Sequence, residues 1–299
     1  MQINSNILSL QAVNFFKMTT FYTQNTLKNY VQTEKSAGKT IGFVPTMGAL
    51  HKGHLSLVRN AMTDNDIVCV SVFVNPTQFD NATDLEKYPR TLEADVELLK
   101  TLGKNIFIYA PSIKDIYETD VEAEKFSFDG LEFEMEGKFR TGHFDGVGTI
   151  VKRLLEIVTP HKAYFGEKDF QQLMIIKKLV SKYKIPVEII GCSIFREASG
   201  LAMSSRNERL SDEARKESAF IYKTLLEAQK KFGTKSAMKV KEWVQKQFNK
   251  HPLLTLEYVE IANIKNLKTV KRKSKNETYR IFIAAFIEDI RLIDNVALN

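Results

Sequence analysis

Two histidines separated by two residues are the side chains in this sequence best suited to chemistry. His51 and His54 lie at the end of the segment 45–54 (PTMGALHKGH), which follows an apolar, strand-like run and precedes a helix-like one. The N–H groups and dipole of a helix N-terminus attract phosphate. Two imidazoles on one face of a first turn can donate hydrogen bonds to a phosphoryl group under attack. The segment therefore predicts a phosphate-binding site; a surface pair of histidines is the alternative, which this context disfavours.

Two glycine-rich nucleotide-binding motifs are excluded. Gly48 and Gly53 have the spacing of a P-loop, but His and Leu follow them where a P-loop requires Lys and Ser or Thr. The pair Gly146-x-Gly148 lacks a third glycine and does not follow a strand, so it is not a dinucleotide fingerprint. The histidine pair remains the better candidate for contact with phosphate.

Polar segments follow other apolar runs and are expected at the same edge of a sheet. Residues 75–79 (NPTQF) follow the second run, and residues 165–172 (FGEKDFQQ) follow the fourth. Ligands bind at the carboxyl ends of parallel strands, although Asp169 could simply cap the next helix. Residues 200–207 (GLAMSSRN) form a hydroxyl-rich loop that ends in Arg206 and Asn207 and has no evident partner except phosphate. These segments predict one phosphate-binding edge with a loop able to close over it.

The elements that must position these residues follow an α/β pattern. Between residues 39 and 192, apolar runs alternate with helical periodicity, as in a parallel sheet with crossover helices. Strands are expected at 40–44, 67–74, 106–109, 162–165 and 187–192, and helices at 26–37, 55–62, 92–102, 149–158 and 170–183. The predicted fold class is α/β: a Rossmann-like doubly wound parallel sheet with a smaller C-terminal α+β domain.

The pattern changes after the fifth expected strand. Helices are expected at 212–232 and 236–249 and strands at 254–261 and 279–286, while the acidic segment 131–142 is expected to be a loop. The predicted division is an N-terminal extension at 1–17 with no assigned function, a nucleotide-binding domain at 18–193 and a C-terminal lid domain at 194–299.

Composition limits the class of protein. The 299 residues are 43% hydrophobic and 26% charged, which is ordinary for a globular chain. The chain has two cysteines, Cys69 and Cys192, each in an apolar run, which excludes a disulfide framework and a four-ligand zinc site. No run is long and apolar enough to span a membrane, and no secretory signal is recognisable. A cytoplasmic enzyme without membrane contact is expected.

The net charge of +7 raises the possibility of nucleic-acid binding. Residues 223–299 hold 16 basic and 8 acidic residues, which leaves 27 and 28 for residues 1–222. The densest run, 271–275 (KRKSK), precedes a strand-like segment and is interpreted as a solvated hairpin tip. No aromatic residues interleave with these lysines as a single-strand binder requires. Nucleic acid is not expected as a partner; a lid over a polyanionic substrate is the alternative for this run.

Several motifs in order resemble the pantothenate synthetase family, which belongs to the nucleotidyltransferases with a His-x-x-His or His-x-Gly-His signature. The matching segments are 44–54, 73–79, 88–91, 142–144, 165–173, 200–207 and 291–295. The resemblance implies ATP-dependent condensation of (R)-pantoate with β-alanine to pantothenate, AMP and pyrophosphate through an enzyme-bound pantoyl adenylate. It also implies a homodimer whose ligands are these small molecules.

The resemblance implies a role for each matched residue. His54 is the acid or transition-state stabiliser, with His51 and Lys168 beside it as catalytic residues. Gln78 and Gln172 hold pantoate, and Gln78 is also close to β-alanine. Residues implied to contact ATP are Met47, Gly48, His51, His54, Gly166, Glu167, Lys168, Asp169, Phe195 through its backbone, Met203, Ser204, Ser205 and Arg206.

The resemblance further implies that Mg²⁺ bridges the phosphates, with Asp95 as the candidate residue that helps to hold it. Two positions depart from the family pattern: Ser199 stands where Asp is usual, and Glu288 stands where Gly is common. Two alternatives stay open. Another adenylyl- or cytidylyltransferase of this fold would keep the histidines but not both Gln78 and Gln172. A nucleic-acid or partner-binding protein would explain only the C-terminal charge.

Overall fold

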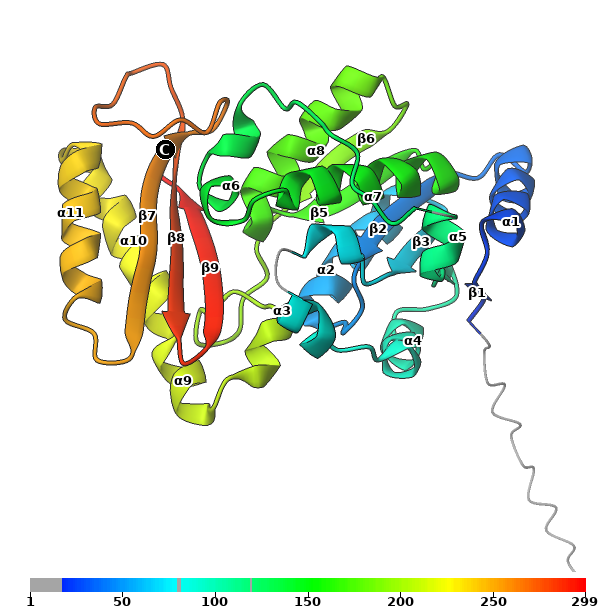
Figure 1. The fold of residues 1–299 in the computed structure, drawn as a ribbon, viewed down its shortest axis with the longest axis horizontal. Helices are drawn as coiled ribbons and strands as arrows, with labels where there is room; N and C mark the ends of the chain where they lie inside the picture. The colour runs from blue at the N-terminus through cyan, green and yellow to red at the C-terminus, as the bar shows by residue number, and fades with distance from the viewer. Residues whose placement is uncertain (1–17, 80–81, 119) are drawn as a thin grey trace, which may run out of the picture.

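The computed structural model describes residues 18–79, 82–118 and 120–299. The predicted N-terminal extension at 1–17 lies outside the described residues. A six-stranded sheet with helices on both faces lies beside a three-stranded sheet with its own helices (Figure 1). This arrangement confirms the predicted fold class.

All pairings in the six-stranded sheet are parallel, and the strand order is β1-β4-β3-β2-β5-β6. The order reverses between β2 and β5, and the crevice at such a switch point is where doubly wound sheets bind ligands. The strands are β1 (Thr20–Phe21), β2 (Ile41–Thr46), β3 (Ile67–Val72), β4 (Ile106–Tyr109), β5 (Lys162–Gly166) and β6 (Glu188–Cys192).

Apolar side chains on both faces of the central strands explain why helices cover the sheet twice. Val44 and its neighbours pack against one set of helices, α2 (Lys52–Asp64) and α4 (Leu92–Lys100). Phe43 faces the opposite set, which consists of α1 (Gln24–Ser36), α5 (Ile113–Tyr117), α7 (His143–Val158) and α8 (Phe170–Tyr183). Cys69 and Cys192 are both buried and free.

Two segments differ from their prediction. Helix α7 begins at His143, six residues before the expected start, and its two glycines are part of its buried face. Residues 131–142 were expected to form a loop, but they contain a 3₁₀ turn (Leu131–Phe133) and the short helix α6 (Glu136–Phe139). Buried Gln171 donates to the carbonyls of Leu131 and Glu134. The segment is therefore ordered by a distant side chain, which local periodicity does not reveal.

The C-terminal part contains an antiparallel sheet of β7 (Leu254–Asn263), β8 (Tyr279–Ile287) and β9 (Ile290–Ala297). Helices α10 (Ala219–Thr234) and α11 (Ala237–Phe248) pack on one face. On the other face, Phe282 reaches the core of the first sheet, so the two parts share apolar contacts. The expected helix 212–232 is divided into α9 (Asp212–Glu217) and α10, and strand β9 was not predicted.

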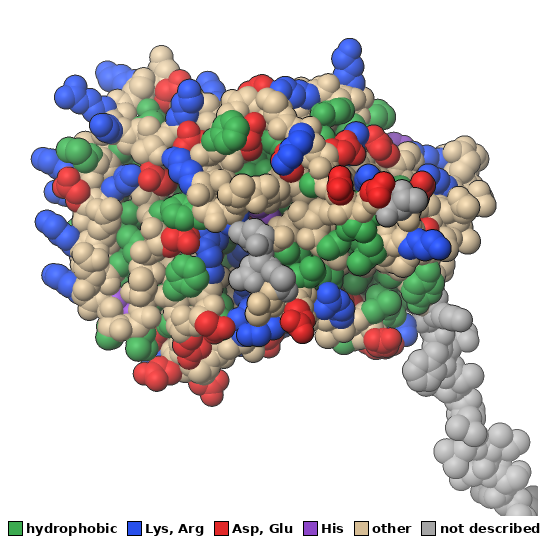
Figure 2. Space-filling view, viewed as in Figure 1, with side chains coloured by type: hydrophobic (Ala, Val, Ile, Leu, Met, Phe, Trp, Pro, Cys, Tyr) green, Lys and Arg blue, Asp and Glu red, His purple; other side chains and the backbone are tan. Residues whose placement is uncertain are grey.

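The turn between β8 and β9 explains one departure from the family pattern. Glu288 has φ +53°, a left-handed conformation that glycine adopts at little cost. The basic run 271–275 lies between β7 and β8 and its residues are exposed, which agrees with its interpretation as a hairpin tip. Figure 2 shows many basic side chains on the side of the molecule formed by the C-terminal elements. None of the helices in the described ranges is long and apolar enough to cross a membrane.

Candidate active site

A cavity of about 260 Å³ lies at the carboxyl ends of β2, β3, β5 and β6 and gathers most of the predicted residues. The predicted residues that line it are Met47, His51, His54, Gln78, Gly166, Lys168, Asp169, Gln172, Phe195, Met203, Ser204, Ser205 and Arg206. Gly48, Asp95 and Glu167 do not line it. One cavity thus combines the phosphate-binding edge with both glutamines.

The two histidines form the N-terminal cap of α2. His51 is the N-cap residue, in extended conformation, and its Nδ1 accepts the N–H of Gly53 at 3.1 Å. The Nδ1 of His54 accepts the N–H of His51 at 3.3 Å, and the two rings stack with centroids 4.0 Å apart. This corrects the expectation that both histidines belong to the first helical turn. Because each Nδ1 is an acceptor, each neutral ring carries its proton on Nε2.

Gly53 allows this stacked arrangement. A Cβ atom on Gly53 would lie 2.8 Å from Cε1 of the His51 ring, which real Cβ contacts do not tolerate. Glycine is therefore required at position 53 for a steric reason, because the ring of His51 lies over the backbone of this residue.

Both imidazoles are neutral at pH 7. Burial, helped by the charge of Lys168, lowers the pKa of His51 to about 4 against the opposing charge of Glu197. Burial, with the charges of His51 and Lys168, lowers the pKa of His54 to about 3. Neutral rings with Nε2–H groups are hydrogen-bond donors, so the arrangement suits stabilisation of developing phosphoryl charge better than transfer of a proton.

Asp95 holds the backbone of the phosphate-binding segment. One carboxylate oxygen accepts the N–H of Leu50 at 2.7 Å and the other accepts the N–H of Ala49 at 3.1 Å. Ala49 has φ +50°, so these bonds hold a left-handed residue in place. Burial raises the pKa of Asp95, and these hydrogen bonds oppose the rise.

This role does not favour Asp95 as a magnesium ligand. Asp95 is only 2% exposed, and both of its carboxylate oxygens already accept hydrogen bonds. Nowhere in the described part of the chain do three or more His, Cys, Asp or Glu residues lie together in a way that could hold a metal ion. The donor set of the protein therefore does not fit a magnesium ion held by side chains alone.

The segment after β5 carries Lys168. Asp169 is the N-cap residue of α8, but its side chain makes no capping hydrogen bond and lies 3.6 Å from the Lys168 ammonium group. Capping alone therefore does not explain Asp169. The carboxylate of Glu167 instead accepts a hydrogen bond from Arg280 of β8 at 3.0 Å. The side chain of Glu167, predicted to contact ATP, thus connects the two sheets.

The glutamines enter the cavity from different elements. The side-chain nitrogen Nε2 of Gln78 lies 3.0 Å from the sulfur of Met47. The side-chain oxygen Oε1 of Gln78 accepts a hydrogen bond from the side-chain amide of Asn75 at 3.3 Å. Gln172 lies in the first turn of α8, directly after Gln171, which is buried and bonded to backbone. The chain thus presents one glutamine to the cavity and uses its neighbour to hold residues 131–136.

Helix α7 supplies an apolar wall that residue chemistry did not predict. Val147, Ile150, Val151 and Leu154 line the cavity at helical spacing, together with Phe73. The signal was present as i, i+3, i+4 periodicity, but the expected helix start at 149 concealed part of it.

Gly146 brings this wall close to the segment that carries Gln78. A Cβ atom there would lie 2.1 Å from the carbonyl oxygen of Thr77. Arg140 and His143 also line the cavity and were not assigned a role from the sequence.

The loop 200–207 contacts the phosphate-binding segment directly. Ser205 Oγ donates to the carbonyl of Ala49 at 3.1 Å, and Ser204 Oγ accepts the N–H of Arg206 at 3.3 Å. Arg206 also has an interaction within the protein. The expectation that these groups lack protein partners is therefore wrong. The Met203 N–H donates to the carbonyl of Phe195 at 3.0 Å, which joins the two segments predicted to contact adenine and phosphate.

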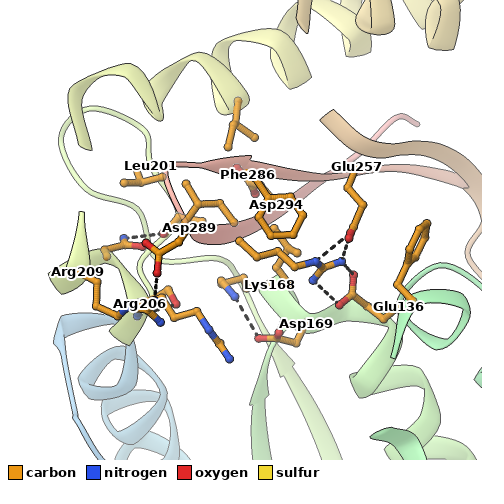
Figure 3. A pocket seen from close by; sticks show the side chains of 18 of the residues that line it. Glu136, Lys168, Asp169, Leu201, Arg206, Arg209, Glu257, Phe286, Asp289 and Asp294 are labelled. Atoms are coloured by element: carbon orange, nitrogen blue, oxygen red, sulfur yellow. Dashed lines mark hydrogen bonds and ion pairs between the residues drawn. The ribbon is translucent and has the colours of Figure 1, made fainter. Parts of the chain in front are cut away.

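An outer cleft of about 410 Å³ continues from this cavity between the two parts of the molecule. Lys168, Asp169 and Arg206 line both spaces, and Figure 3 shows them below strands of the C-terminal sheet. Across the cleft, Arg291 donates to Glu136 at 2.7 and 2.8 Å and also to Glu257. Although burial would raise the pKa of Glu136, the Arg291 bonds hold it below its usual value. These ion pairs fasten α6 to the C-terminal sheet.

The doubly wound sheet, with stacked histidines and a lysine at its switch point, defines a nucleotide-binding α/β protein. The chain belongs to the pantoate-beta-alanine ligase family, whose model matches residues 19–297.

Relatives and solved structures agree over nearly the whole chain. It is 58% identical to the pantothenate synthetase of Flavobacterium psychrophilum, covering 94% of this chain and 100% of the relative. It is 44% identical to that of Bacteroides fragilis strain YCH46, covering 93% and 98%. The pantothenate synthetase structure from Thermus thermophilus matches with a TM-score of 0.86 and 36% identity, covering 94% and 99%. A Francisella tularensis pantoate-beta-alanine ligase, complexed with beta-gamma ATP and beta-alanine, matches with a TM-score of 0.76 and 35% identity, covering 94% and 98%.

Proposed function

We propose that this chain catalyses the ATP-dependent ligation of (R)-pantoate and β-alanine to pantothenate, AMP and pyrophosphate through a pantoyl adenylate. The observation that carries the proposal is the shared cavity, in which the neutral histidine pair and Lys168 face the same space as Gln78 and Gln172. Family membership supports the same substrates.

In the first step a carboxylate oxygen of pantoate attacks the α-phosphorus of ATP. The bond from that phosphorus to the bridging oxygen of the β-phosphate breaks, and pyrophosphate leaves. His51 and His54 donate Nε2–H bonds to the charge that develops, and Lys168 neutralises the α-phosphate. The two histidines are held before reaction by their hydrogen bonds in the α2 cap, so these donors need little reorganisation.

The remaining ATP contacts follow the cavity lining. Gly166 and Asp169 hold the ribose, and the backbone of Phe195 meets adenine. Met203, Ser204, Ser205 and Arg206 bind the β- and γ-phosphates at the point where Ser205 joins the loop to Ala49. A closed loop keeps water from the adenylate.

Pantoate has both polar oxygens and two methyl groups. The side-chain amides of Gln78 and Gln172 donate to its hydroxyl and carboxylate without adding a charge that would weaken the nucleophile. The methyl groups pack against the α7 wall of Val147, Ile150 and Val151. The wall gives apolar contact beside the polar contacts of the two glutamines.

In the second step the β-alanine nitrogen attacks the acyl carbon of the adenylate. The bond from that carbon to the phosphate oxygen breaks, AMP leaves, and the new amide loses the extra proton of the amine to solvent. A magnesium ion that enters with ATP would offset the charge of the phosphates, and Asp95 would hold the backbone of Ala49 and Leu50 beside them. We also propose that the protein works in the cytoplasm as a homodimer. The nucleotide-binding domain would end near residue 193, where the C-terminal lid domain begins.

Pantoate-dependent exchange of labelled pyrophosphate into ATP tests this proposal. Exchange is expected with pantoate and without β-alanine, because adenylation is reversible. Formation of ADP and a phosphorylated pantoate would indicate a kinase. Exchange that does not require pantoate would indicate a different nucleotidyltransferase.

A further inference from the structure

The loop assigned to the β- and γ-phosphates begins with a small backbone hairpin. The N–H of Glu197 donates to the carbonyl of Leu201 at 2.9 Å. Arg196 pairs with Ala202 in an antiparallel bridge. The residues proposed to contact these phosphates, 203–206, follow the hairpin directly. The position of the hairpin therefore determines where the phosphate contacts lie.

One arginine of this hairpin is held by the C-terminal sheet. The guanidinium of Arg196 donates to the two carboxylate oxygens of Asp294 at 2.6 and 2.8 Å. Its Nη1 also donates to the carbonyl of Gly200 at 3.0 Å, and the group lies over the ring of Tyr222, 3.7 Å from the centroid. Arg196 does not line the cavity or the outer cleft. Its charge thus serves contacts within the protein and not contact with a ligand.

Gly200 closes the hairpin against the same tyrosine. It has φ +94°, and a Cβ atom there would lie 2.5 Å from Cδ1 of Tyr222. Backbone conformation and close approach therefore both require glycine at this turn. Because the Gly200 carbonyl accepts from Arg196, the arginine, the tyrosine and the glycine form one packed base for the loop.

Asp294 connects this base to the backbone of Lys168. Asp294 is only 4% exposed and accepts the N–H of its neighbour Asn295 at 2.7 Å. The side chain of Asn295 donates to the carbonyls of Glu167 and Lys168, both at 2.9 Å. Asp294 and Lys168 also line the same outer cleft (Figure 3). Two adjacent residues of β9 thus hold the segment assigned to the α-phosphate and, through Arg196, the loop assigned to the other two phosphates.

We propose that Arg196 is a positioning residue for ATP, which places the phosphate loop at a fixed distance from Lys168 through its ion pair with Asp294. This rests on the proposed function above. Arg196 acts on the loop that meets the β- and γ-phosphates, whereas Asn295 acts on the lysine that meets the α-phosphate. The ion pair therefore raises the preference of the site for ATP over AMP, which carries only the α-phosphate and must leave after the second step.

Calorimetric titration with ATP and with AMP, both without pantoate, tests this role in an Arg196→Lys variant. Lysine keeps the positive charge, but its ammonium group lacks the planar fork that holds Asp294 and the Gly200 carbonyl together. Affinity for ATP is expected to fall about 10-fold, as loss of a charged hydrogen bond predicts, while affinity for AMP stays within about twofold of wild type. Arg272→Lys is the matched control, because Arg272 is exposed between β7 and β8.

Variants of the two β9 residues separate the two ends of the triphosphate. Asp294→Asn keeps the shape of the side chain and removes the charge that holds the guanidinium, so it should reproduce the selective loss of ATP affinity. Asn295→Ala should weaken ATP and AMP about equally, because both nucleotides carry the α-phosphate. Affinity for AMP also reports folding, since a variant that binds AMP like wild type has an intact nucleotide site.

The ratio of the two affinities decides between a positioning and a merely structural role. Equal losses of ATP and AMP affinity in Arg196→Lys would overturn the assignment. Unchanged ATP affinity in both Arg196→Lys and Asp294→Asn would overturn it as well. Absence of pantoate-dependent pyrophosphate exchange in the wild-type protein would instead refute the proposed function, and the ATP and AMP titrations, which contain no pantoate, are read independently of that result.

Discussion

The side-chain amide of Asn295 donates hydrogen bonds of 2.9 Å to the backbone carbonyls of both Glu167 and Lys168. Asn295 lies in β9 of the C-terminal sheet and is only 2% exposed. Arg280 of the neighbouring strand donates to its oxygen, which fixes the orientation of the amide. The backbone of the lysine assigned to the α-phosphate is thus positioned by a residue far away in the sequence, in the other part of the molecule.

Asn295→Ala should slow adenylation without unfolding the protein. Loss of two buried hydrogen bonds leaves the Glu167 and Lys168 carbonyls without these donors, at a cost of about 1 to 3 kcal/mol. Pantoate-dependent exchange should fall roughly 10-fold, and Asn295→Asp, which presents oxygens to carbonyls, should fall further. Asn299→Ala is the control, since this exposed amide bonds Glu277 away from the cavity. Wild-type exchange in Asn295→Ala would show that β9 does not position Lys168.

His54→Ala should slow adenylation by ~10² to 10³, which is typical for removal of one donor aimed at transition-state charge. ATP affinity should change far less, because the ring acts on charge that develops during attack. Single-turnover formation of pyrophosphate and calorimetric titration with ATP measure the two effects. His251→Ala, which alters a histidine of the C-terminal part, is the control. Near wild-type turnover in His54→Ala would make the pair a purely structural helix cap.

The two histidines also predict a pH dependence of stability. Their pKa values in the folded protein, about 4 for His51 and about 3 for His54, lie below the ordinary value near 6.5. Between these values the unfolded chain binds protons that the folded protein does not, so the free energy of unfolding falls as pH drops from about 6.5 toward 4.

Urea unfolding at pH 7 and pH 4.5 measures this loss. A His51→Gln/His54→Gln double variant should lose less stability over the same interval than wild type. NMR titration of the imidazole protons should give pKa midpoints near 4 and 3, and midpoints near 6.5 would contradict the buried, neutral assignment.

The features that were predicted correctly from the sequence are those that a local residue pattern specifies. The apolar strands and the histidine segment between β2 and α2 have periodicity and turn residues that identify them without tertiary information. Strand β9 was not predicted because Asp294 and Asn295 interrupt its apolar pattern. Their partners are Arg196, bonded to Asp294 at 2.6 Å, and the backbone near Lys168, both distant in sequence.

Residue type alone also left the role of acidic residues open. The family resemblance implied that Asp95 helps to hold magnesium and that Glu167 contacts ATP. In the structure Asp95 accepts backbone N–H groups and Glu167 accepts from Arg280. Whether a carboxylate faces a cation or an amide depends on the orientation of its helix or loop, which spacing does not determine.

The adjacent residues Gln171 and Gln172 allow an effect on substrate binding to be distinguished from an effect on folding. Gln172→Ala should weaken pantoate binding by about 1 to 3 kcal/mol, the cost of a buried polar partner left unsatisfied, with ATP affinity and melting temperature nearly unchanged. Gln171→Ala should do the reverse and lower the melting temperature, because Gln171 is 4% exposed and holds the Leu131 and Glu134 carbonyls and the Glu136 N–H. Calorimetric titration with pantoate in the presence of a non-hydrolysable ATP analogue, paired with thermal unfolding, measures both. If Gln172→Ala lost ATP affinity and kept pantoate affinity, the pantoate site would have to lie on the other side of the phosphates.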